Sequence, residues 1–322
     1  MENSCHLDRK DLQDEIAKVF GTGYRVAVIT RMYGGAQKVV YKVDCDNGFS
    51  CVLYVWDISK NYFQQEVENL DMTERSYGAE LFELNNRYLT LQGIRTPALY
   101  SLNQEKNVCP FDYALVEYVH GQKAEVYFQA DSKIRDELFH QLGDMLSAMH
   151  ADERQVYGKL DYDGSRTDMC HRMMMENAAD WLSYASEHIQ SIAANQSKLL
   201  DTLYALESKM KPRARYGFIH GELGPDHILV NENLEPYLID IEGAMFFDIE
   251  HEHCFMEIRF GDHYRYLTND SLDPDRMAFY KLSHHISLTT GGLKLLHRAF
   301  PDQKLAHQIY DYNYRSALRF IE

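Results

Sequence analysis

Hydrophobic positions near the start of the chain fall in short runs that predict β-strands. The segments 24–32, 39–44 and 49–56 are rich in β-branched and aromatic residues, and glycine or asparagine bounds them. Residues 45–48 have the sequence CDNG, which is typical of a turn between two strands. The pattern therefore predicts a three-stranded antiparallel meander in this part of the chain.

The next hydrophobic residues have the spacing of a helix. In 78–93 they recur every three or four positions, and the segment ends at Gly93, a residue type that often ends helices. Two more strand-like runs follow, at 94–102 and 111–121. Five strands and one helix are enough for a small lobe of mixed structure.

After Gly121 the spacing of the hydrophobic residues becomes mainly helical. The clearest pattern spans 131–153, starts at the polar residue Asp131 or Ser132, and gathers its apolar side chains on one face. That face carries Ile134, Leu138, Leu142, Met145, Leu146 and Met149. Further helices are predicted in 168–210, 276–288 and 304–321, and two short strands, 227–230 and 236–240, interrupt them.

Composition narrows the class of partner. The chain of 322 residues is 45% hydrophobic, which is typical of a globular protein, and it carries a formal charge of −16. This charge repels a phosphate backbone, so nucleic acid is not an expected partner, whereas a cationic small molecule would be attracted.

The sequence also indicates a compartment. Its start lacks the apolar run of a signal peptide, and no apolar run approaches the ~18 residues that a membrane helix needs. The six cysteines are scattered singly, without the spacing of a zinc site or a disulfide framework. We therefore expect a soluble, unprocessed protein of the reducing cytoplasm that does not contact a membrane.

One segment carries most of the recognisable chemistry. Residues 218–244 have the sequence FIHGELGPDHILVNENLEPYLIDIEGA. Before it come, in chain order, a glycine-containing turn between the first two strands, ALVEYVHG at 114–121 and LGDMLSAMH at 142–150. In this order and spacing the chain resembles the aminoglycoside phosphotransferase and choline kinase group, small-molecule relatives of the protein kinases.

The resemblance implies a fold and a set of reactants. The expected fold is α+β and bilobal, like that of protein kinases, with a small antiparallel-sheet lobe at 1–118 and a mainly helical lobe at 119–322. The expected donor is ATP or GTP with a divalent metal, Mg²⁺ or Mn²⁺, and the acceptor is a small molecule. Nucleotide contacts would come from Gly34 and Gly35 in the turn and from Glu117, Tyr118 and Val119 at the base.

The catalytic segment departs from the group at two positions. Its members carry His-Gly-Asp, then asparagine five residues after the aspartate, and a second aspartate at the end of the next strand. Here His220 and Gly221 match, and Asp240 matches the metal-binding aspartate. Glu222 stands in the place of the catalytic base and keeps a carboxylate that can accept a hydroxyl proton. The alternative role for Glu222 is to brace the loop.

His227 stands in the place of the asparagine. A neutral imidazole can bind a divalent ion, but Mg²⁺ prefers oxygen ligands, so a nitrogen ligand favours Mn²⁺ or another transition ion. An imidazolium could instead bind phosphate, and the ring could also hydrogen-bond within the loop. Glu242 lies two residues after Asp240 and is a candidate for a second metal oxygen.

A third departure concerns the cation that holds the nucleotide phosphates. The group presents lysine or arginine in the middle of the third strand, paired with a carboxylate on a helix. Tyr54 occupies that place here. Lys38 or Lys42 could supply the charge from another direction, although surface lysines are usually solvated. The carboxylate would be Glu83 or Glu80, with an ordinary exposed helix residue as the alternative.

The segment DIEHEH at 248–253 suggests a metal cluster at first sight. Helical spacing puts Asp248 beside Glu252 and turns His251 away from both, so we favour a role in bracing the loop over zinc binding.

The function that we favour is transfer of a γ-phosphoryl group to a hydroxyl of a small polar or cationic molecule, either an aminoglycoside-like antibiotic or a metabolite. Glu222 and His220 would be the catalytic residues. Two alternatives stay open: a catalytically impaired nucleotide-binding or regulatory module, and nucleotidyl transfer on the same fold. The sequence identifies neither the acceptor nor the oligomeric state.

Overall fold

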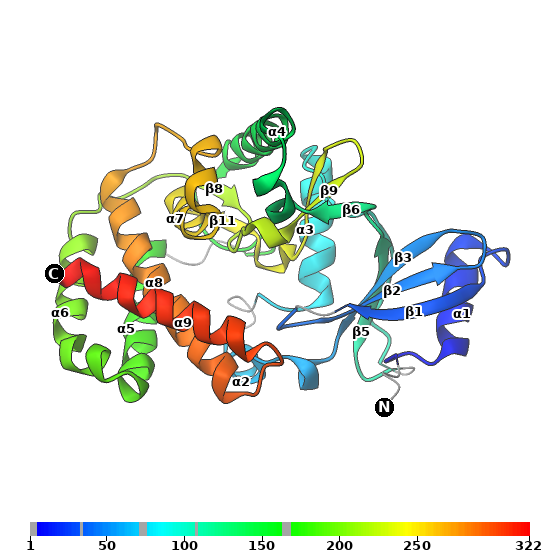
Figure 1. Ribbon diagram of the computed structural model, residues 1–322, viewed down its shortest axis with the longest axis horizontal. Coiled ribbons are helices and arrows are strands. Elements are labelled where there is room, and N and C mark those ends of the chain that lie inside the picture. The colour runs from blue at the N-terminus through cyan, green and yellow to red at the C-terminus, as the bar shows by residue number, and fades with distance from the viewer. Residues whose placement is uncertain (1–4, 33–34, 71–75, 107–108, 163–168) are drawn as a thin grey trace. The chain divides into compact units, whose positions relative to one another are not determined.

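The computed structural model describes residues 5–32, 35–70, 76–106, 109–162 and 169–322 (Figure 1). The chain divides into two compact units, and each unit is formed by two stretches of sequence. Unit 1 comprises Met1–Gln141 and Asp226–Gly243, and unit 2 comprises Leu142–Pro225 and Ala244–Glu322. The lobe boundary after residue 118 stays a prediction.

A five-stranded antiparallel sheet forms the centre of unit 1. β-branched and aromatic residues fill its strands, and Gly48 takes a φ of 85° in the turn between the second and third strands. The predicted meander and the two later strands are confirmed. The strands are β1 (Val26–Met32), β2 (Val39–Cys45), β3 (Ser50–Trp56), β4 (Leu99–Asn103) and β5 (Asp112–Glu117), in the spatial order β1-β2-β3-β5-β4.

Helix α1 (Arg9–Phe20) covers one face of this sheet. Its residues Leu12 and Ile16 are fully buried, and they share a hydrophobic cluster with Leu53 and Val55 of β3. Successive side chains of a strand point to opposite faces, so residues 53 and 55 lie on the face that α1 covers. This apolar layer anchors β3 and leaves the intervening residues of the strand for the opposite face.

The opposite face carries aromatic side chains from β3. The rings of Tyr54 and Trp56 each lie within contact of Phe82 on helix α3 (Ala79–Leu91), with ring centroids 5.4 and 5.5 Å apart. Helix α3 is the helix predicted in 78–93, and its beginning after Gly78 agrees with that prediction. The position of α3 is therefore set by packing against the face of the sheet that carries Tyr54.

Unit 1 also contains a small sheet with the order β10-β9-β6. Only glycine fits at position 121 on the edge of this sheet, because a Cβ atom there would lie 1.7 Å from the carbonyl oxygen of Val230. The two short strands predicted after residue 226 are confirmed. The remaining elements are β6 (Gly121–Lys123), β9 (Ile228–Asn231), β10 (Pro236–Leu238), α2 (Gln64–Asn69) and the short 3-10 helices η1 (Ile58–Lys60), η2 (Ala124–Gln129), η3 (Pro225–His227) and η4 (Ile241–Gly243).

Helix α4 (Ser132–His150) begins in unit 1 and ends in unit 2. It matches the amphipathic helix that the sequence predicts from residue 131 or 132. Five of the six residues expected on its apolar face are buried, and Ile134 is the exception with 39% exposure. The exposed residue lies in the first turn, where a helix has fewer neighbours.

Unit 2 is mostly helical, which together with the antiparallel sheet of unit 1 confirms the predicted kinase-like fold class. Helices α8 and α9 pack closely, because a Cβ atom on Gly292 of α8 would lie 2.7 Å from the backbone nitrogen of Tyr310 on α9. A small sheet has the order β11-β8-β7. The elements are β7 (Glu153–Arg154), β8 (Tyr216–Ile219), β11 (Met245–Phe247), α5 (Cys170–His188), α6 (Gln190–Glu207), α7 (Ile249–Phe260), η5 (Gly261–Tyr266), α8 (Pro274–His297), α9 (Gln303–Leu318) and η6 (Arg319–Ile321).

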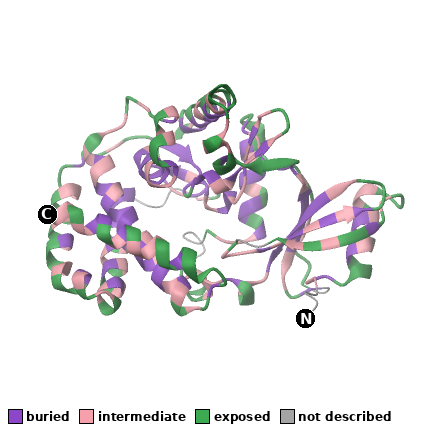
Figure 2. Cartoon of the chain, viewed as in Figure 1, coloured by how far each residue is buried: buried purple, intermediate pink, exposed green. Residues whose placement is uncertain are grey.

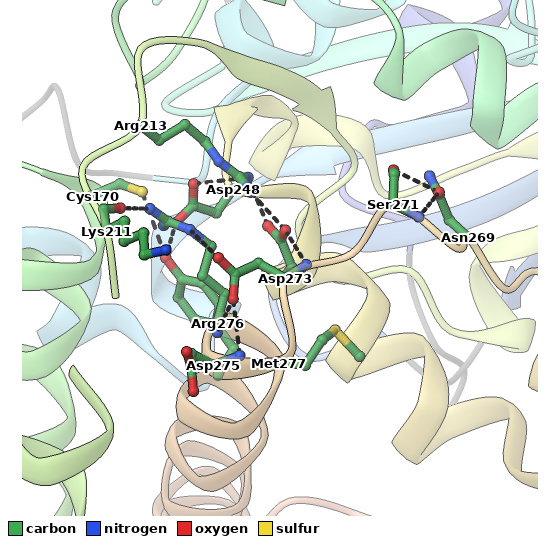
Figure 3. Close-up of polar contacts among 12 residues, drawn as sticks. Cys170, Lys211, Arg213, Asp248, Asn269, Ser271, Asp273, Asp275, Arg276 and Met277 are labelled. Carbon is green, nitrogen blue, oxygen red and sulfur yellow. Dashed lines mark hydrogen bonds and ion pairs between the residues drawn. The ribbon is translucent and has the colours of Figure 1, made fainter. Parts of the chain in front are cut away.

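A buried charge network ties the start of α7 to α8 within unit 2 (Figure 3). Asp248, directly before α7, accepts hydrogen bonds from the guanidinium of Arg276 and, at 2.6 Å, from the hydroxyl of Tyr280. Arg213 forms ion pairs with Asp248 at 3.2 Å and with Glu250 at 2.6 Å. Both carboxylates are fully buried, and removal of one partner from such a network typically costs about 3–5 kcal/mol.

The helices of unit 2 differ in how far they are buried. Figure 2 shows mostly buried positions along α7 and α8, whereas α6 and α9 carry many exposed positions. The buried interior of unit 2 therefore lies around α7 and α8. Along the described ranges, none of the helices combines the length and the apolar character needed to cross a membrane.

Candidate functional site

A buried lysine lies between two carboxylates in unit 1. Lys38 stands directly before β2, and its side chain is only 7% exposed. Its Nζ lies 2.6 Å from Asp240 Oδ1 and 2.6 Å from Glu242 Oε1. Burial acts to lower the pKa of Lys38, but the two carboxylates outweigh burial, so its pKa is raised. The ammonium group is therefore charged at neutral pH.

The register of the sheet explains why Lys38 reaches this place. Val40 of β2 pairs with Tyr54 of β3. Lys38 precedes Val40 by two positions, so its side chain shares a sheet face with Tyr54 one strand away. Its Nζ lies 4.8 Å from the centre of the Tyr54 ring, within the range of a cation–π contact.

Glu242 is held by donors from two parts of unit 1. Its Oε1 accepts hydrogen bonds from Lys38 Nζ at 2.6 Å and from Trp56 Nε1 at 3.1 Å. The amide nitrogen of Asn85 on α3 donates to the backbone carbonyl of Ile241 at 2.7 Å. The sheet thus fixes the carboxylate of Glu242, and α3 fixes the backbone beside it.

Asp240 and His227 lie next to each other at the ends of β10 and η3. Asp240 has a φ of 57°, which few residues other than glycine adopt, and its side chain is 41% exposed. His227 Nε2 lies 3.6 Å from Asp240 Oδ2 and 3.8 Å from Asp226 Oδ2. The structure therefore places two of the three predicted metal ligands, Asp240 and His227, next to each other.

The side chains around Asp240 can be compared with the ligands that a divalent metal ion needs. Within the described residues, no three His, Cys, Asp or Glu side chains are arranged to hold one ion. Asp240 and His227 offer one oxygen and one nitrogen ligand, and a divalent ion can complete its shell with phosphate oxygens and water. Glu242 fits less well, because Lys38 and Trp56 both bond its Oε1.

The His-Gly-Glu segment lies in unit 2, where Glu252 braces it. His220 is buried, whereas Glu222 is exposed. Gly221 has a φ of 94°, and its N–H donates to Glu252 Oε1 at 2.9 Å. His150 Nε2 donates to the other carboxylate oxygen of Glu252 at 2.6 Å. Burial acts to raise the pKa of Glu252, but the His150 bond outweighs it and the pKa is lowered, so Glu252 stays ionised. This is the bracing role that the sequence suggested for the DIEHEH segment.

The predicted nucleotide contacts are placed in part. Gly34 lies outside the described residues, and a Cβ atom on Gly35 would lie 3.2 Å from the carbonyl oxygen of Lys38. Glu117 uses its Oε2 and its N–H to bond Ala98, at 3.0 and 2.9 Å. Val119 is buried and Tyr118 is partly exposed. Their contacts with a base stay a prediction.

The other candidates for the charge pair lie in different surroundings. Lys42 pairs with Asp44 at 2.8 Å and is 29% exposed, so it behaves as a surface lysine. Glu80 and Glu83 are exposed on α3, which is the alternative that the sequence left open for them. Of the residues weighed for the missing strand lysine, Lys38 is the buried one.

Sequence reasoning missed three residues that hold the site together. Trp56 shares a strand face with Tyr54, so alternation along β3 could have indicated it. Asn85 lies on the apolar face of the α3 pattern, and a polar residue at such a position needs a partner. His150 ends the motif LGDMLSAMH, but no local pattern indicates that it bonds Glu252, which lies 102 positions away.

Comparison with known proteins identifies the family. The model of the phosphotransferase enzyme family matches residues 80–254, more than half of the 322-residue chain. The chain belongs to the phosphotransferase enzyme family. The matched residues include the His-Gly-Glu segment, His227 and Asp240, so the resemblance and the prediction of a small-molecule phosphotransferase are confirmed. No curated protein sequence matches the chain.

Solved structures of family members share the fold at low identity. A thermostable mutant of aminoglycoside phosphotransferase APH(4)-Ia is 17% identical with a TM-score of 0.64, over 94% of this chain and 98% of that one. Spectinomycin phosphotransferase APH(9)-Ia is 16% identical with a TM-score of 0.65, over 94% and 93%. The choline kinase LicA from Streptococcus pneumoniae is 12% identical with a TM-score of 0.60, over 97% and 98%.

Proposed function

We propose that this phosphotransferase moves the γ-phosphoryl group of a nucleoside triphosphate to a hydroxyl of a small polar molecule. The observation that carries the proposal is the buried Lys38, fixed between Asp240 and Glu242. Phosphoryl transfer needs a cation on the nucleotide phosphates and a carboxylate for the metal that accompanies them. A charged lysine beside Asp240 supplies both kinds of group in unit 1.

Similar structures support the choice of reactants. Two of them are complexes of APH(4)-Ia with hygromycin B and either ADP or AMP-PNP, and a third is a complex of APH(9)-Ia with ADP and spectinomycin. ATP or GTP is accordingly the donor that we propose. The formal charge of −16 favours a cationic acceptor, such as an aminoglycoside-like antibiotic or a metabolite, in the cytoplasm.

Glu222 is the proposed base. The acceptor oxygen bonds to the γ-phosphorus as the bond from that phosphorus to the bridging oxygen of the diphosphate breaks, and Glu222 takes the hydroxyl proton. Its side chain is exposed and therefore open to a substrate. His220 positions it, because the N–H of Glu222 lies 3.4 Å from His220 Nδ1. The bond from Gly221 to Glu252 fixes the backbone before it.

Asp240 and His227 are the proposed metal ligands. A divalent ion, Mg²⁺ or Mn²⁺, would neutralise charge on the nucleotide phosphates when bound. The half-exposed Asp240 carboxylate and the neighbouring imidazole leave room for phosphate oxygens and water on such an ion. Gly34 and Gly35 would lie at the phosphates, and the segment from Glu117 to Val119 at the base.

The catalytic base is tested with the variant Glu222→Gln. Glu232→Gln is its control, because Glu232 is an exposed carboxylate close in sequence. We expect Glu222→Gln to lower kcat by roughly 10²–10⁴-fold and to leave nucleotide affinity nearly unchanged, since the amide cannot accept the proton. Glu232→Gln should leave both unchanged. Equal turnover in the two variants would exclude Glu222 as the base. Nucleotide binding without turnover in the wild type would favour a nucleotide-binding module instead.

A further inference from the structure

The ion pair that the family resemblance implies on β3 and α3 is replaced by aromatic residues. Tyr54 occupies the position of the expected strand lysine, and Phe82 on helix α3 packs against it. These rings pack edge to face with centroids 5.4 Å apart. Burial raises the pKa of Tyr54, so its hydroxyl stays protonated, and a tyrosine has no positive charge in either protonation state that could pair with phosphate. The phosphate-binding cation must therefore come from another element.

We propose that Lys38 and Glu242 replace this pair: Lys38 binds the nucleotide phosphates, and Glu242 orients Lys38 and does not bind metal. The proposal rests on the proposed function, since it assigns residues to the donor side of that reaction. It moves the cation from the third strand to the start of the second strand. It also moves the carboxylate from the helix to the segment after Asp240.

The sheet makes the two lysine positions equivalent. Residue 38 lies directly before β2, Tyr54 lies on the neighbouring strand β3, and Nζ of Lys38 lies over the ring of Tyr54 at 4.8 Å. A lysine side chain at position 54 would extend from the place where the Tyr54 ring now contacts the Lys38 ammonium group. The same charge can therefore reach the same region from either strand, and Tyr54 supplies an aromatic surface for it.

The surroundings of the two carboxylates separate their roles. Glu242 is 9% exposed, and its Oε1 takes both the Lys38 ammonium and the Trp56 N–H. An ion that used this oxygen would have to displace both donors. Asp240 is 41% exposed, and its two oxygens face different groups, Lys38 on one side and His227 on the other. Asp240 can therefore keep a metal while Glu242 holds the lysine.

Helix α3 still supports the relocated pair, although through uncharged groups. Asn85 donates to the carbonyl oxygen of Ile241 at 2.7 Å, directly before Glu242. Trp56, which bonds Glu242, packs against Phe82 of the same helix with ring centroids 5.5 Å apart. The helix thus positions the carboxylate of the pair without supplying it.

The test compares Lys38→Met with the control Lys42→Met, which removes a nearby lysine of β2. It also includes the double variant Lys38→Met/Tyr54→Lys. Affinity for ATP with metal, and for inorganic tripolyphosphate, is measured by calorimetry on the full chain. We expect Lys38→Met to weaken both by roughly 10–100-fold, the loss typical of a charge-assisted bond. Lys42→Met should change neither by more than about twofold, and Tyr54→Lys should restore at least half of the lost affinity on a logarithmic scale.

The role of Glu242 is tested by metal titration. Glu242→Gln should weaken nucleotide binding while leaving the metal concentration needed for half-maximal binding unchanged, whereas Asp240→Asn should raise that concentration. If Lys38→Met does not fold, Lys38→Met/Glu242→Gln removes both charges together and replaces it in the comparison.

The outcomes separate this inference from the proposed function. Tight binding by the wild type with no difference between Lys38→Met and Lys42→Met would overturn the inference and the part of Lys38 in the donor site, whereas nucleotide binding by the proposed phosphotransferase would stand. An increased metal requirement in Glu242→Gln, equal to that of Asp240→Asn, would overturn the role of Glu242. Failure of the wild type to bind either nucleotide or tripolyphosphate would overturn both the inference and the proposed function.

Discussion

At the scale of single residues, the two exchanges in the catalytic segment have different physical consequences. Glu222 keeps the charge of the residue that it replaces and lies exposed, so the change is one of reach. His227 replaces an oxygen donor by nitrogen and lies 3.6 Å from the carboxylate of Asp240. We therefore expect the second exchange to alter the choice of metal more than it alters the chemistry of the acceptor.

The variant His227→Asn tests this consequence. An imidazole ligand should give the protein a preference for Mn²⁺ or Co²⁺ over Mg²⁺, and an amide oxygen should move the preference towards Mg²⁺ by at least tenfold in relative affinity, about 1.4 kcal/mol. The measurement is nucleotide affinity against each metal, with the exposed His120→Asn as control. An unchanged ratio of metal affinities would show that His227 does not contact the ion.

The residues of the site differ in how far the sequence could predict them. Asp240 and Glu222 stand at fixed distances from His220, so spacing along the chain identifies them. Lys38 and Glu242 are 204 positions apart, and their bond depends on burial that no local pattern encodes. For this reason the sequence analysis left Lys38 and Lys42 as equal candidates for the phosphate-binding cation and predicted Glu242 as a metal ligand.

At the scale of elements, local patterns were sufficient for the strands of the five-stranded sheet, for the two short strands after residue 226 and for helices α3 and α4. Runs of β-branched and aromatic residues predicted β1 to β3, and the helical spacing of apolar residues predicted α3 and α4. The charge network before α7 was less visible, since Asp248 takes its partners from α8 and from the segment before β8. Such partners are set by the packing of helices and not by the residues beside Asp248.

Buried histidines of α7 and α8 give unit 2 a predicted acid sensitivity. Burial lowers the pKa of His253 to about 4 and that of His284 to about 4, whereas an unfolded histidine titrates near ~6.5. The unfolded chain therefore binds the proton first, and stability that is present above pH ~6.5 is lost as the pH falls towards 4. Each histidine contributes on the order of 3 kcal/mol to this loss.

The variant His284→Gln should flatten that loss, because glutamine can still donate to the carbonyl oxygen of His251, as His284 Nε2 does at 2.7 Å, and does not titrate. Urea unfolding between pH 7 and pH 4 measures the effect, with the exposed His307→Gln as control. The same pH dependence in both variants would exclude His284 as a cause of acid sensitivity.

At the scale of the whole molecule, the proposed donor-side groups belong to unit 1 and the proposed proton acceptor belongs to unit 2. Lys38, Asp240 and His227 belong to the first unit and Glu222 to the second. The family match over residues 80–254 includes residues of both units. The acidic charge of the whole chain concerns the acceptor, because it favours cations over anions without selecting one of them.

The mass of the product is the measurement that tests phosphoryl transfer most directly. The wild type is incubated with ATP or GTP, Mg²⁺ or Mn²⁺, and a panel of hydroxylated amines and antibiotics, and the acceptors are analysed by mass spectrometry. We expect one class of acceptor to gain a single phosphoryl group, with one nucleoside diphosphate formed for each product. The variant Glu222→Gln should give no product. A product that gains a nucleoside monophosphate, or nucleotide binding with no modified acceptor, would contradict this expectation.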